Sequence, residues 1–302
     1  MKSTVPILAN QGLQNELNKN GYIVVDFLSS TDVQRLSHLF EEMNANRDDI
    51  PYDRLYTCLH NPDPKYRNSM SSKIREIINP KIAAHFSDVK NTVYTFQIKG
   101  IGPNSELYAH QDWTFTREDE GYRTYTFWVS LVDSNENNGT LSVLPSSHLK
   151  LNNIRGAGIE PVLSGKQHEA VPLLTPLSMK AGQLVLFDSA LLHYSAPNMS
   201  DSIRVSVMTN IMPKNADVYL YFQNKKNVDS ADEYLVPDDF FLHYQDFETE
   251  YETPPSFGIK TRTVKNSNLL ISKLPASVFS ETSTSFSRKI GQLVKSMFHG
   301  IL

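Results

Sequence analysis

The sequence predicts a mainly β fold with flanking helices, in which the strands form an antiparallel sandwich or barrel. From residue 91 onward, short β-branched and aromatic runs alternate with Gly, Pro, Asn and Asp turn signals, a pattern typical of antiparallel β-proteins. Before residue 90, apolar residues recur mainly at helical spacing. The chain of 302 residues is 40% hydrophobic, enough for one large core. We therefore expect a single domain over residues 1–302.

The first 90 residues are expected to support the β core. We predict helices over residues 10–19, 31–43 and 72–78, a strand over 22–27, and loops over 44–68. Leu13 and Leu17 lie four residues apart, and Gly21 follows the first helix as a C-terminal glycine would. The third helix is expected to stop before Pro80, because proline disfavours helical conformation in the residue that precedes it.

The β core is expected to cover about residues 91–215. Its strands are predicted over residues 91–100, 123–133, 140–145, 175–180, 183–188, 190–195 and 203–212. The segment 149–172 is too long for a simple hairpin loop, so we interpret it as a cover over a site.

The region 216–302 is expected to form a C-terminal extension. It begins with one more strand over 217–223, and 223–270 is expected to be mostly loop. Apolar residues at helical spacing predict a helix over 285–302. That helix is expected to dock on its own domain or on a second subunit, which fits a monomer or a homodimer.

Charge and composition exclude several classes of protein. The net charge is −4, with no long basic run, so nucleic acid is not an expected partner. No window of 18 apolar residues is present to span a membrane, and the N-terminal apolar run is too short for a signal segment. The single cysteine, Cys58, excludes a disulfide framework within the chain. We expect a soluble, cytoplasmic protein.

His110 and Asp112 form the first candidate site. They lie two residues apart in YAHQDWT, residues 108–114. In an extended strand, residues i and i+2 point to the same face. We therefore expect an imidazole and a carboxylate to project together, as two ligands of a three-ligand metal site.

His193 offers a second imidazole, after the strand-like run QLVLFDSALL. Two imidazoles and one carboxylate leave open coordination positions, which suits Fe(II) in oxygen chemistry. Three protein ligands with an open position also suit Zn²⁺ in hydrolysis. The residue types alone leave both metals open.

Arg204 follows His193 by eleven residues. A turn after His193 and a returning strand would bring the guanidinium back beside the site, where it can bind a carboxylate in bidentate fashion. A dicarboxylate cosubstrate is one such partner, and a structural ion pair with Asp188 or Asp201 is the other. Between these regions, Asn137-Asn138-Gly139 is expected to form a hairpin-type turn.

The sequence resembles the phytanoyl-CoA dioxygenase-like family of Fe(II)- and 2-oxoglutarate-dependent oxygenases over about residues 10–215. The resemblance is carried by four motifs: NGYIVVDFLS near the start, HQD at 110–112, FWVSLVDSNENNGTLSVLPSSH at 127–148 and KAGQLVLFDSALLHYSAPNMSDSIR at 180–204. It implies a double-stranded β-helix, the jelly roll of cupin-like proteins.

The resemblance also implies roles for individual residues. His110, Asp112 and His193 would bind Fe(II), and Arg204 would bind the distal carboxylate of 2-oxoglutarate. Gln111, Trp128 and Ser195 fall where the family often lines the cosubstrate pocket. The implied reaction couples decarboxylation of 2-oxoglutarate by O₂, giving succinate and CO₂, to oxidation of a substrate C–H bond. Hydroxylation is the expected outcome, with desaturation, cyclisation or epoxidation as alternatives.

The candidate substrate contacts lie beyond the HQD motif and in the cover. They are Trp113, Phe115, Arg117, Arg123, Lys166 and His168. Two other functions remain to be separated from the oxygenase. A cupin-type hydrolase or isomerase would use the same three ligands, although Arg204 disfavours it. A non-catalytic binding module is disfavoured by the complete set of ligands.

Overall fold

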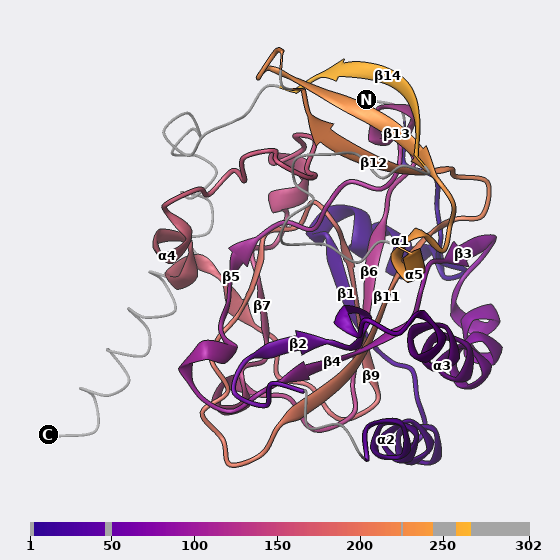
Figure 1. Ribbon diagram of the computed structural model, residues 1–302, viewed down its shortest axis with the longest axis vertical. Helices are drawn as coiled ribbons and strands as arrows, with labels where there is room; N and C mark the ends of the chain where they lie inside the picture. The colour runs from indigo at the N-terminus through magenta and orange to yellow at the C-terminus, as the bar shows by residue number, and fades with distance from the viewer. Residues whose placement is uncertain (1–2, 46–49, 225, 244–257, 267–302) are drawn as a thin grey trace, which may run out of the picture.

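The computed structural model describes residues 3–45, 50–224, 226–243 and 258–266 (Figure 1). Its helices are α1 (Gln11–Asn20), α2 (Ser30–Asn44), α3 (Pro64–His85), α4 (Gln167–Ala170) and α5 (Phe240–His243). Its strands are β1 (Tyr22–Asp26), β2 (Leu55–Thr57), β3 (Val89–Asn91), β4 (Thr95–Lys99), β5 (Leu107–His110), β6 (Tyr125–Ser130), β7 (Leu141–Val143), β8 (Thr175–Pro176), β9 (Gln183–Asp188), β10 (His193–Ser195), β11 (Arg204–Pro213), β12 (Val218–Gln223), β13 (Ser230–Val236) and β14 (Ile259–Lys265).

Two antiparallel sheets form the core of the molecule. The larger sheet has the order β1-β9-β6-β11-β4-β2, with β3 also paired to β11. The smaller sheet has the order β5-β10-β7-β8. Because strands that are distant in sequence alternate between the two sheets, the arrangement is a jelly roll. It confirms the predicted mainly β fold and the double-stranded β-helix that the resemblance implied.

The larger sheet is covered on both faces, which explains why every residue of β6 is buried. Phe127 and Val129 pack in a core cluster that includes side chains of α2 and α3. Trp128, on the opposite face, packs in another cluster with Leu141 and Val143 of the smaller sheet. Since alternate strand residues point to opposite faces, one face of β6 packs against helices and the other lines the interior.

The N-terminal helices confirm most of the local predictions. α1 begins after Asn10, whose side chain accepts a hydrogen bond from the backbone of Leu13, and ends at Gly21 in the left-handed conformation. α2 begins with a capping box between Ser29 and Asp32. In Figure 1, α2 and α3 lie next to each other on one side of the sheets.

α3 corrects two predictions. Residues 44–68 are not all loop, because they contain β2 and the first turn of α3. The helix also continues through Pro80 to His85 instead of ending at residue 78. Asp63 caps its first turn and Pro64 occupies the position where a missing N–H costs nothing. Burial of Met70, Ile74 and Ile77 against the larger sheet outweighs the hydrogen bond that Pro80 removes.

The turn at Asn137-Asn138-Gly139 corrects a third prediction. It joins β6 of the larger sheet to β7 of the smaller one, and these strands do not pair, so it is not a hairpin. The residues Glu136–Asn138 form a single 3₁₀ turn, capped by Asn135. Gly139 follows with a φ of 67°.

A third sheet places strands in the described part of residues 223–270, which were expected to be mostly loop. It has the order β12-β13-β14 and is labelled at the top of Figure 1. β12 confirms the strand predicted over 217–223. The helix predicted over 285–302 lies outside the described residues. Within the described part of the chain, no helix is both long enough and apolar enough to cross a membrane.

Glu233 of β13 links this third sheet to the core. Its side chain is 0% exposed, and it accepts hydrogen bonds from Arg117 at 2.9 Å, from Arg262 at 2.9 Å and from Tyr221 at 2.8 Å. A buried carboxylate with two guanidinium partners is stabilising only while all the charges remain paired.

We predict that Glu233→Gln lowers the free energy of unfolding by about 3 kcal/mol, because two partly buried guanidinium groups lose their buried counter-charge. Urea denaturation followed by circular dichroism measures the change. The matched control is Asp119→Asn, which removes an Arg262 partner whose side chain is 60% exposed and should cost less than about 1 kcal/mol. An equal loss of unfolding free energy in Glu233→Gln and Asp119→Asn would contradict a special role for the buried Glu233 carboxylate.

Candidate active site

His110, Asp112 and His193 converge in the interior, at the edge of the smaller sheet. β5 and β10 are adjacent, and His110 is the direct cross-strand partner of His193. One oxygen of Asp112, Oδ1, lies 3.6 Å from His110 Nε2 and 3.7 Å from His193 Nε2. The three candidate ligand atoms all lie within 4.8 Å of one another.

The structural reason for this convergence differs from the prediction. β5 ends at His110, so Asp112 does not follow His110 along one strand. Cross-strand pairing aligns the two histidines, and the segment after β5 brings Asp112 to them. Arg155 holds that segment, because its Nε donates a hydrogen bond of 2.8 Å to the backbone carbonyl of Asp112.

The hydrogen bonds around the cluster orient its donor atoms. His110 Nδ1 donates to the carbonyl of Tyr108 at 2.7 Å, and His193 Nδ1 donates to that of Leu191 at 2.9 Å. In each ring this leaves Nε2 with a free lone pair that points to the cluster. Thr126 of β6 donates its hydroxyl to Asp112 Oδ2, so Oδ1 is the oxygen that faces the two imidazoles.

Burial and neighbouring charges tune the same groups. Burial, reinforced by the nearby His110, lowers the pKa of His193 to about 4, so the ring is neutral at pH 7. Burial opposes ionisation of Asp112, but the two imidazoles and Thr126 together lower the pKa of this carboxyl below its usual value. Two imidazoles and one carboxylate are the donor set that suits Fe(II) with open positions, so these residues fit that metal.

Arg204 lies in the same cavity as the cluster. This cavity has a volume of about 110 Å³ and is lined by the three candidate ligands and by Arg204, Trp128 and Ser195, among others. Arg204 is 3% exposed. Its Nη1 donates to the carbonyl of Gly139 and to Ser134 Oγ, and its guanidinium carbon lies 5.0 Å from the centre of the Trp128 ring.

The guanidinium of Arg204 has no acidic partner among the described residues. Asp188, one of the two alternatives from the sequence, lies beside Arg123 at 3.9 Å, and no ion pair joins Arg204 to Asp201 in the same part of the chain. Arg204 Nε is buried without any hydrogen-bond partner. A buried cation is costly unless a negative partner meets it, so this cavity has the chemistry of a carboxylate site.

Lys99 lies next to Arg204 and was not anticipated from the sequence. It is the cross-strand neighbour of Arg204 and is 0% exposed. Its Nζ donates to the carbonyls of Ser105 at 2.7 Å and Ser195 at 3.1 Å. Burial and the charge of Arg204 lower the pKa of Lys99 to about 6. At pH 7 Arg204 is therefore the charged member of this buried pair.

Gly139 allows Arg204 to be held in place. A side chain at this position would meet the carbonyl of Ala196 at 2.2 Å and Lys99 Cε at 2.3 Å. Its positive φ also favours glycine. The carbonyl of Gly139 accepts from both Arg204 and Ser195, so the turn fixes one wall of the cavity.

The other predicted cofactor contacts fall in two places. Trp128 and Ser195 line the cavity of Arg204, and Trp128 Nε1 donates to Gln97 at 3.2 Å. Gln111 instead lines a second cavity. Its amide nitrogen donates to the carbonyls of Leu151 at 2.7 Å and Ala190 at 2.5 Å, which ties the segment after β5 to two other segments.

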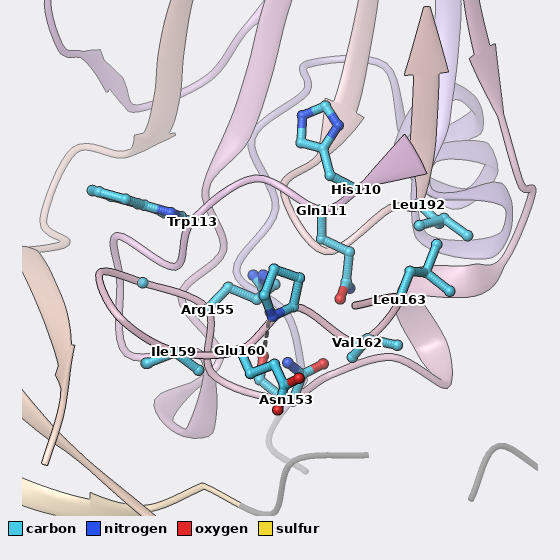
Figure 2. A pocket seen from close by; sticks show the side chains of 12 residues that line it. His110, Gln111, Trp113, Asn153, Arg155, Ile159, Glu160, Val162, Leu163 and Leu192 are labelled. Carbon is cyan, nitrogen blue, oxygen red and sulfur yellow. Dashed lines mark hydrogen bonds between the residues drawn. The ribbon is translucent and has the colours of Figure 1, made fainter. Parts of the chain in front are cut away.

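The second cavity lies on the other side of His110 and has a volume of about 190 Å³. Figure 2 shows its side chains, with His110 at one end and Asn153 and Glu160 at the other. Its lining residues are His110, Gln111, Trp113, Asn153, Arg155, Gly156, Ile159, Glu160, Pro161, Val162, Leu163 and Leu192. Eight of these twelve residues, from Asn153 to Leu163, belong to the segment 149–172. This segment therefore covers the cavity, as expected.

The predicted substrate contacts are only partly brought together. Trp113 lines the second cavity. Phe115 is buried against Phe240 and Phe241. Arg117 is paired with Glu233 and Glu120, and Arg123 with Glu118. Lys166 is exposed, and His168 is exposed with its ring against Tyr108. Of the six, the structure thus places Trp113 in the second cavity, and a substrate role for all six stays a prediction.

Several residues of the site had no readable signal in the sequence. Thr126 lies in an apolar strand-like run, and Arg155 and Asn153 lie in the irregular segment 149–172. Their contacts with Asp112 and with the second cavity depend on chain crossings that no local spacing reveals. The alternation of β6, however, places Thr126 on the same face as Trp128, which is a usable signal once β6 is known to face the interior.

A jelly roll that holds two histidines, one carboxylate and a buried arginine defines the class of mononuclear metalloenzymes built on a double-stranded β-helix. The family model described as phytanoyl-CoA dioxygenase (PhyH) matches residues 17–206. The chain therefore belongs to the phytanoyl-CoA dioxygenase family.

Individual relatives agree with this assignment. A phytanoyl-CoA dioxygenase domain-containing protein 1 homolog of Dictyostelium discoideum is 28% identical over 166 residues, covering 52% of this chain and 57% of that protein. A phytanoyl-CoA dioxygenase of Arabidopsis thaliana is 30% identical over 201 residues, covering 62% of this chain and 68% of that protein. The first match thus spans little more than half the length of the relative.

Solved structures support the fold. The non-heme alpha ketoglutarate dependent carbocyclase SnoK from nogalamycin biosynthesis matches with a TM-score of 0.50 and 18% identity, covering 69% of this chain and 86% of that one. The epimerase SnoN, solved in complex with Fe³⁺ and alpha ketoglutarate, matches with a TM-score of 0.50 and 15% identity, covering 82% of this chain and 93% of that one.

We predict that Thr126→Val weakens Fe(II) binding about 10- to 100-fold, because the hydroxyl that orients Asp112 is lost. Anaerobic titration with Fe(II) measures the change. Thr124→Val is the matched control, since its buried hydroxyl is 3.3 Å from Thr116 Oγ1 rather than bonded to Asp112. Equal affinities for Fe(II) in the wild type and in Thr126→Val would show that the hydrogen bond does not support a metal ligand.

Proposed function

We propose that this chain is an Fe(II)- and 2-oxoglutarate-dependent dioxygenase that hydroxylates an unactivated C–H bond of a small-molecule metabolite. The observation that carries the proposal is one cavity that contains both the three-donor cluster and a buried arginine without an acidic partner. The first feature suits Fe(II), and the second suits the distal carboxylate of 2-oxoglutarate.

Each residue has a definite part in this proposal. His110, Asp112 and His193 would hold Fe(II), and Arg204 would bind the distal carboxylate of the cosubstrate. When bound, iron and 2-oxoglutarate supply the activation of O₂ and the oxidising power, with succinate and CO₂ as coproducts. Trp128 packs beside the guanidinium, and Ser195 and Gly139 fix the wall against which it rests.

The second cavity would receive the metabolite. It shares His110 with the first cavity, so a molecule that fills it would lie next to one of the three candidate metal ligands. The segment 149–172 closes over it, which would exclude water from the reacting groups. Cosubstrate and metabolite therefore have separate cavities that meet at the metal cluster.

A cupin-type hydrolase or isomerase with the same three ligands is the alternative. A hydrolase that uses Zn²⁺ needs one open position for water, and it gives Arg204 no carboxylate to bind. A non-catalytic module is disfavoured because all three donors are present and oriented. The solved carbocyclase and epimerase are similar to this chain in fold alone. They therefore do not indicate which type of C–H oxidation it catalyses, and hydroxylation is part of the proposal.

We also propose that residues 1–302 form one oxygenase domain, with a jelly-roll core over about 91–215. In its support, the third sheet packs on the core through Glu233 and Arg117 and through the cluster around Phe115. A cytoplasmic location and a monomeric or homodimeric state belong to the same proposal. Cys58 is buried, and as the single cysteine of the chain it forms no internal disulfide, in agreement with a reducing compartment.

The test of the proposal is anaerobic addition of Fe(II) and 2-oxoglutarate, followed by the weak visible charge-transfer band of the complex. This measurement requires no knowledge of the metabolite. A screen of metabolites for stimulated succinate release follows. Absence of the band, together with Zn²⁺-dependent hydrolysis, would replace the oxygenase by the alternative.

We predict that Asp112→Ala abolishes Fe(II)-dependent succinate formation without unfolding the protein, because the cluster loses its one carboxylate. Metal content after anaerobic loading and far-ultraviolet circular dichroism measure the two effects. The matched control, Asp201→Ala, removes an exposed carboxylate and should change neither. Turnover at the wild-type rate in Asp112→Ala would mean that the cluster is wrongly assigned.

We predict that Arg204→Ala raises the Michaelis constant for 2-oxoglutarate about 10- to 100-fold, as expected for loss of a hydrogen-bonded charge pair. The wild type should strongly prefer 2-oxoglutarate to 2-oxobutyrate, which lacks the distal carboxylate, and the variant should lose most of this preference. An unchanged Michaelis constant would assign Arg204 to structure. Arg35→Ala, at a residue whose side chain is 58% exposed, is the control.

A further inference from the structure

The second cavity, which the proposed function assigns to the metabolite, has a distinct chemical character. Its walls are apolar around Ile159, Val162, Leu163 and Leu192, as Figure 2 shows. His110 lies at one end, beside the metal cluster. Polar side chains gather at the opposite end, around Asn153 and Glu160. An occupant would therefore place an apolar part near His110 and a polar group at the far end.

The cavity offers no available cation for an anionic group. Among the described residues that line it, Arg155 is the one with a permanent positive charge. Its Nε donates to the carbonyl of Asp112, its Nη1 to the carbonyl of Asn153 at 2.6 Å, and its Nη2 to Glu118 at 2.6 Å. The guanidinium is thus both neutralised and used to hold backbone, and neither Arg117 nor Arg123 lines this cavity.

The side chains at the polar end offer acceptors instead. Asn153 is 8% exposed, and its Oδ1 is buried without a hydrogen-bond partner. Its Nδ2 faces the carbonyl of Ile154 at 3.4 Å. Exchanging the two amide atoms would set oxygen against that carbonyl, so Oδ1 must be the unpartnered atom. A buried acceptor without a donor is costly. A hydrogen-bond donor on the occupant would therefore satisfy Asn153 Oδ1.

Two further acceptors point to the same chemistry. Glu160 lines the cavity at its exposed end, and no ion pair or hydrogen bond within the described residues engages its carboxylate. The amide nitrogen of Gln111 is bound to two backbone carbonyls, so its Oε1 is the atom left for an occupant. A carboxylate and two amide oxygens form a set that accepts hydrogen bonds and favours positive charge.

We propose that the substrates of this site carry a protonated amine on a compact apolar body. The ammonium group would lie between Glu160 and Asn153, and the apolar body would extend along Ile159, Val162 and Leu163 toward His110. This orientation places the end of the apolar body that is distant from the nitrogen next to His110, a candidate metal ligand. The inference rests on the proposed function for the meaning of the metal cluster, but the charge preference rests on the second cavity alone.

The test compares three probes that share one apolar body: cyclohexylmethylamine, cyclohexylmethanol and cyclohexanecarboxylate. Binding to the full chain is measured by isothermal titration calorimetry, under argon with Fe(II) and 2-oxoglutarate and again without either. We expect the amine to bind at least about tenfold more tightly than the alcohol or the carboxylate, because a charged hydrogen bond contributes that much. Tightest binding by the carboxylate would overturn the inference.

Variants at Glu160 test whether this residue causes the preference for the amine probe. Glu160→Gln should reduce amine affinity about tenfold and leave alcohol affinity unchanged, and Glu160→Lys should favour the carboxylate. Glu169→Gln, at an exposed residue of α4 outside the cavity, is the matched control. An amine preference that survives in Glu160→Gln would also overturn the inference. Failure of the proposed function would appear separately, as absence of the visible band whatever the probe preference.

Discussion

The pairing of β5 with β10 is the interaction on which the site depends. It sets His110 directly opposite His193, and the two rings lie with their centres 4.2 Å apart. Positive charge on both of two imidazoles this close would be destabilising, and an oppositely charged group beside their Nε2 atoms is favourable. Asp112 supplies that group, and the carbonyls of Tyr108 and Leu191 fix the orientation of each ring.

The jelly roll separates two chemical environments around this pair. On one side, the space between the two sheets contains Arg204, held by Gly139 and Ser134 and left without an acidic partner in the described residues. On the other side, the segment 149–172 encloses an apolar cavity that ends in acceptors. His110 lines both cavities, so the two environments meet at one of the three candidate metal ligands.

Arginine has opposite uses in these two environments. Arg204 has a buried Nε with no partner, so its charge is available to a ligand. Arg155 is also buried, but all three of its nitrogens donate within the protein, so it supports the backbone of Asp112. The residue type alone therefore does not identify an anion site, since the same guanidinium binds a ligand or positions a loop according to the partners that surround it.

The sequence by itself determined the fold class and named the three residues, His110, Asp112 and His193, that the structure brings together as a candidate metal site. The reason is that strand runs, turn signals and the motifs around His110, Asp112, His193 and Arg204 are local patterns, written in consecutive residues. The glycine that ends α1, Gly21, was likewise local and readable. The continuation of α3 through Pro80 was not, because burial against the larger sheet overrides the local preference of proline.

Only the tertiary structure decided how the remaining parts of the site are arranged. Pairing between strands that are distant in sequence places β6 in the larger sheet and β7 in the smaller one. Asn137-Asn138-Gly139 therefore connects two sheets instead of forming a hairpin. Thr126, Lys99 and Asn153 acquired their roles through side chains that meet from separate segments. Arg117 and Arg123 are paired with acids that lie elsewhere in space, Glu233 and Glu118. Such non-local contacts leave no periodic trace in the sequence, and they define the chemistry of both cavities.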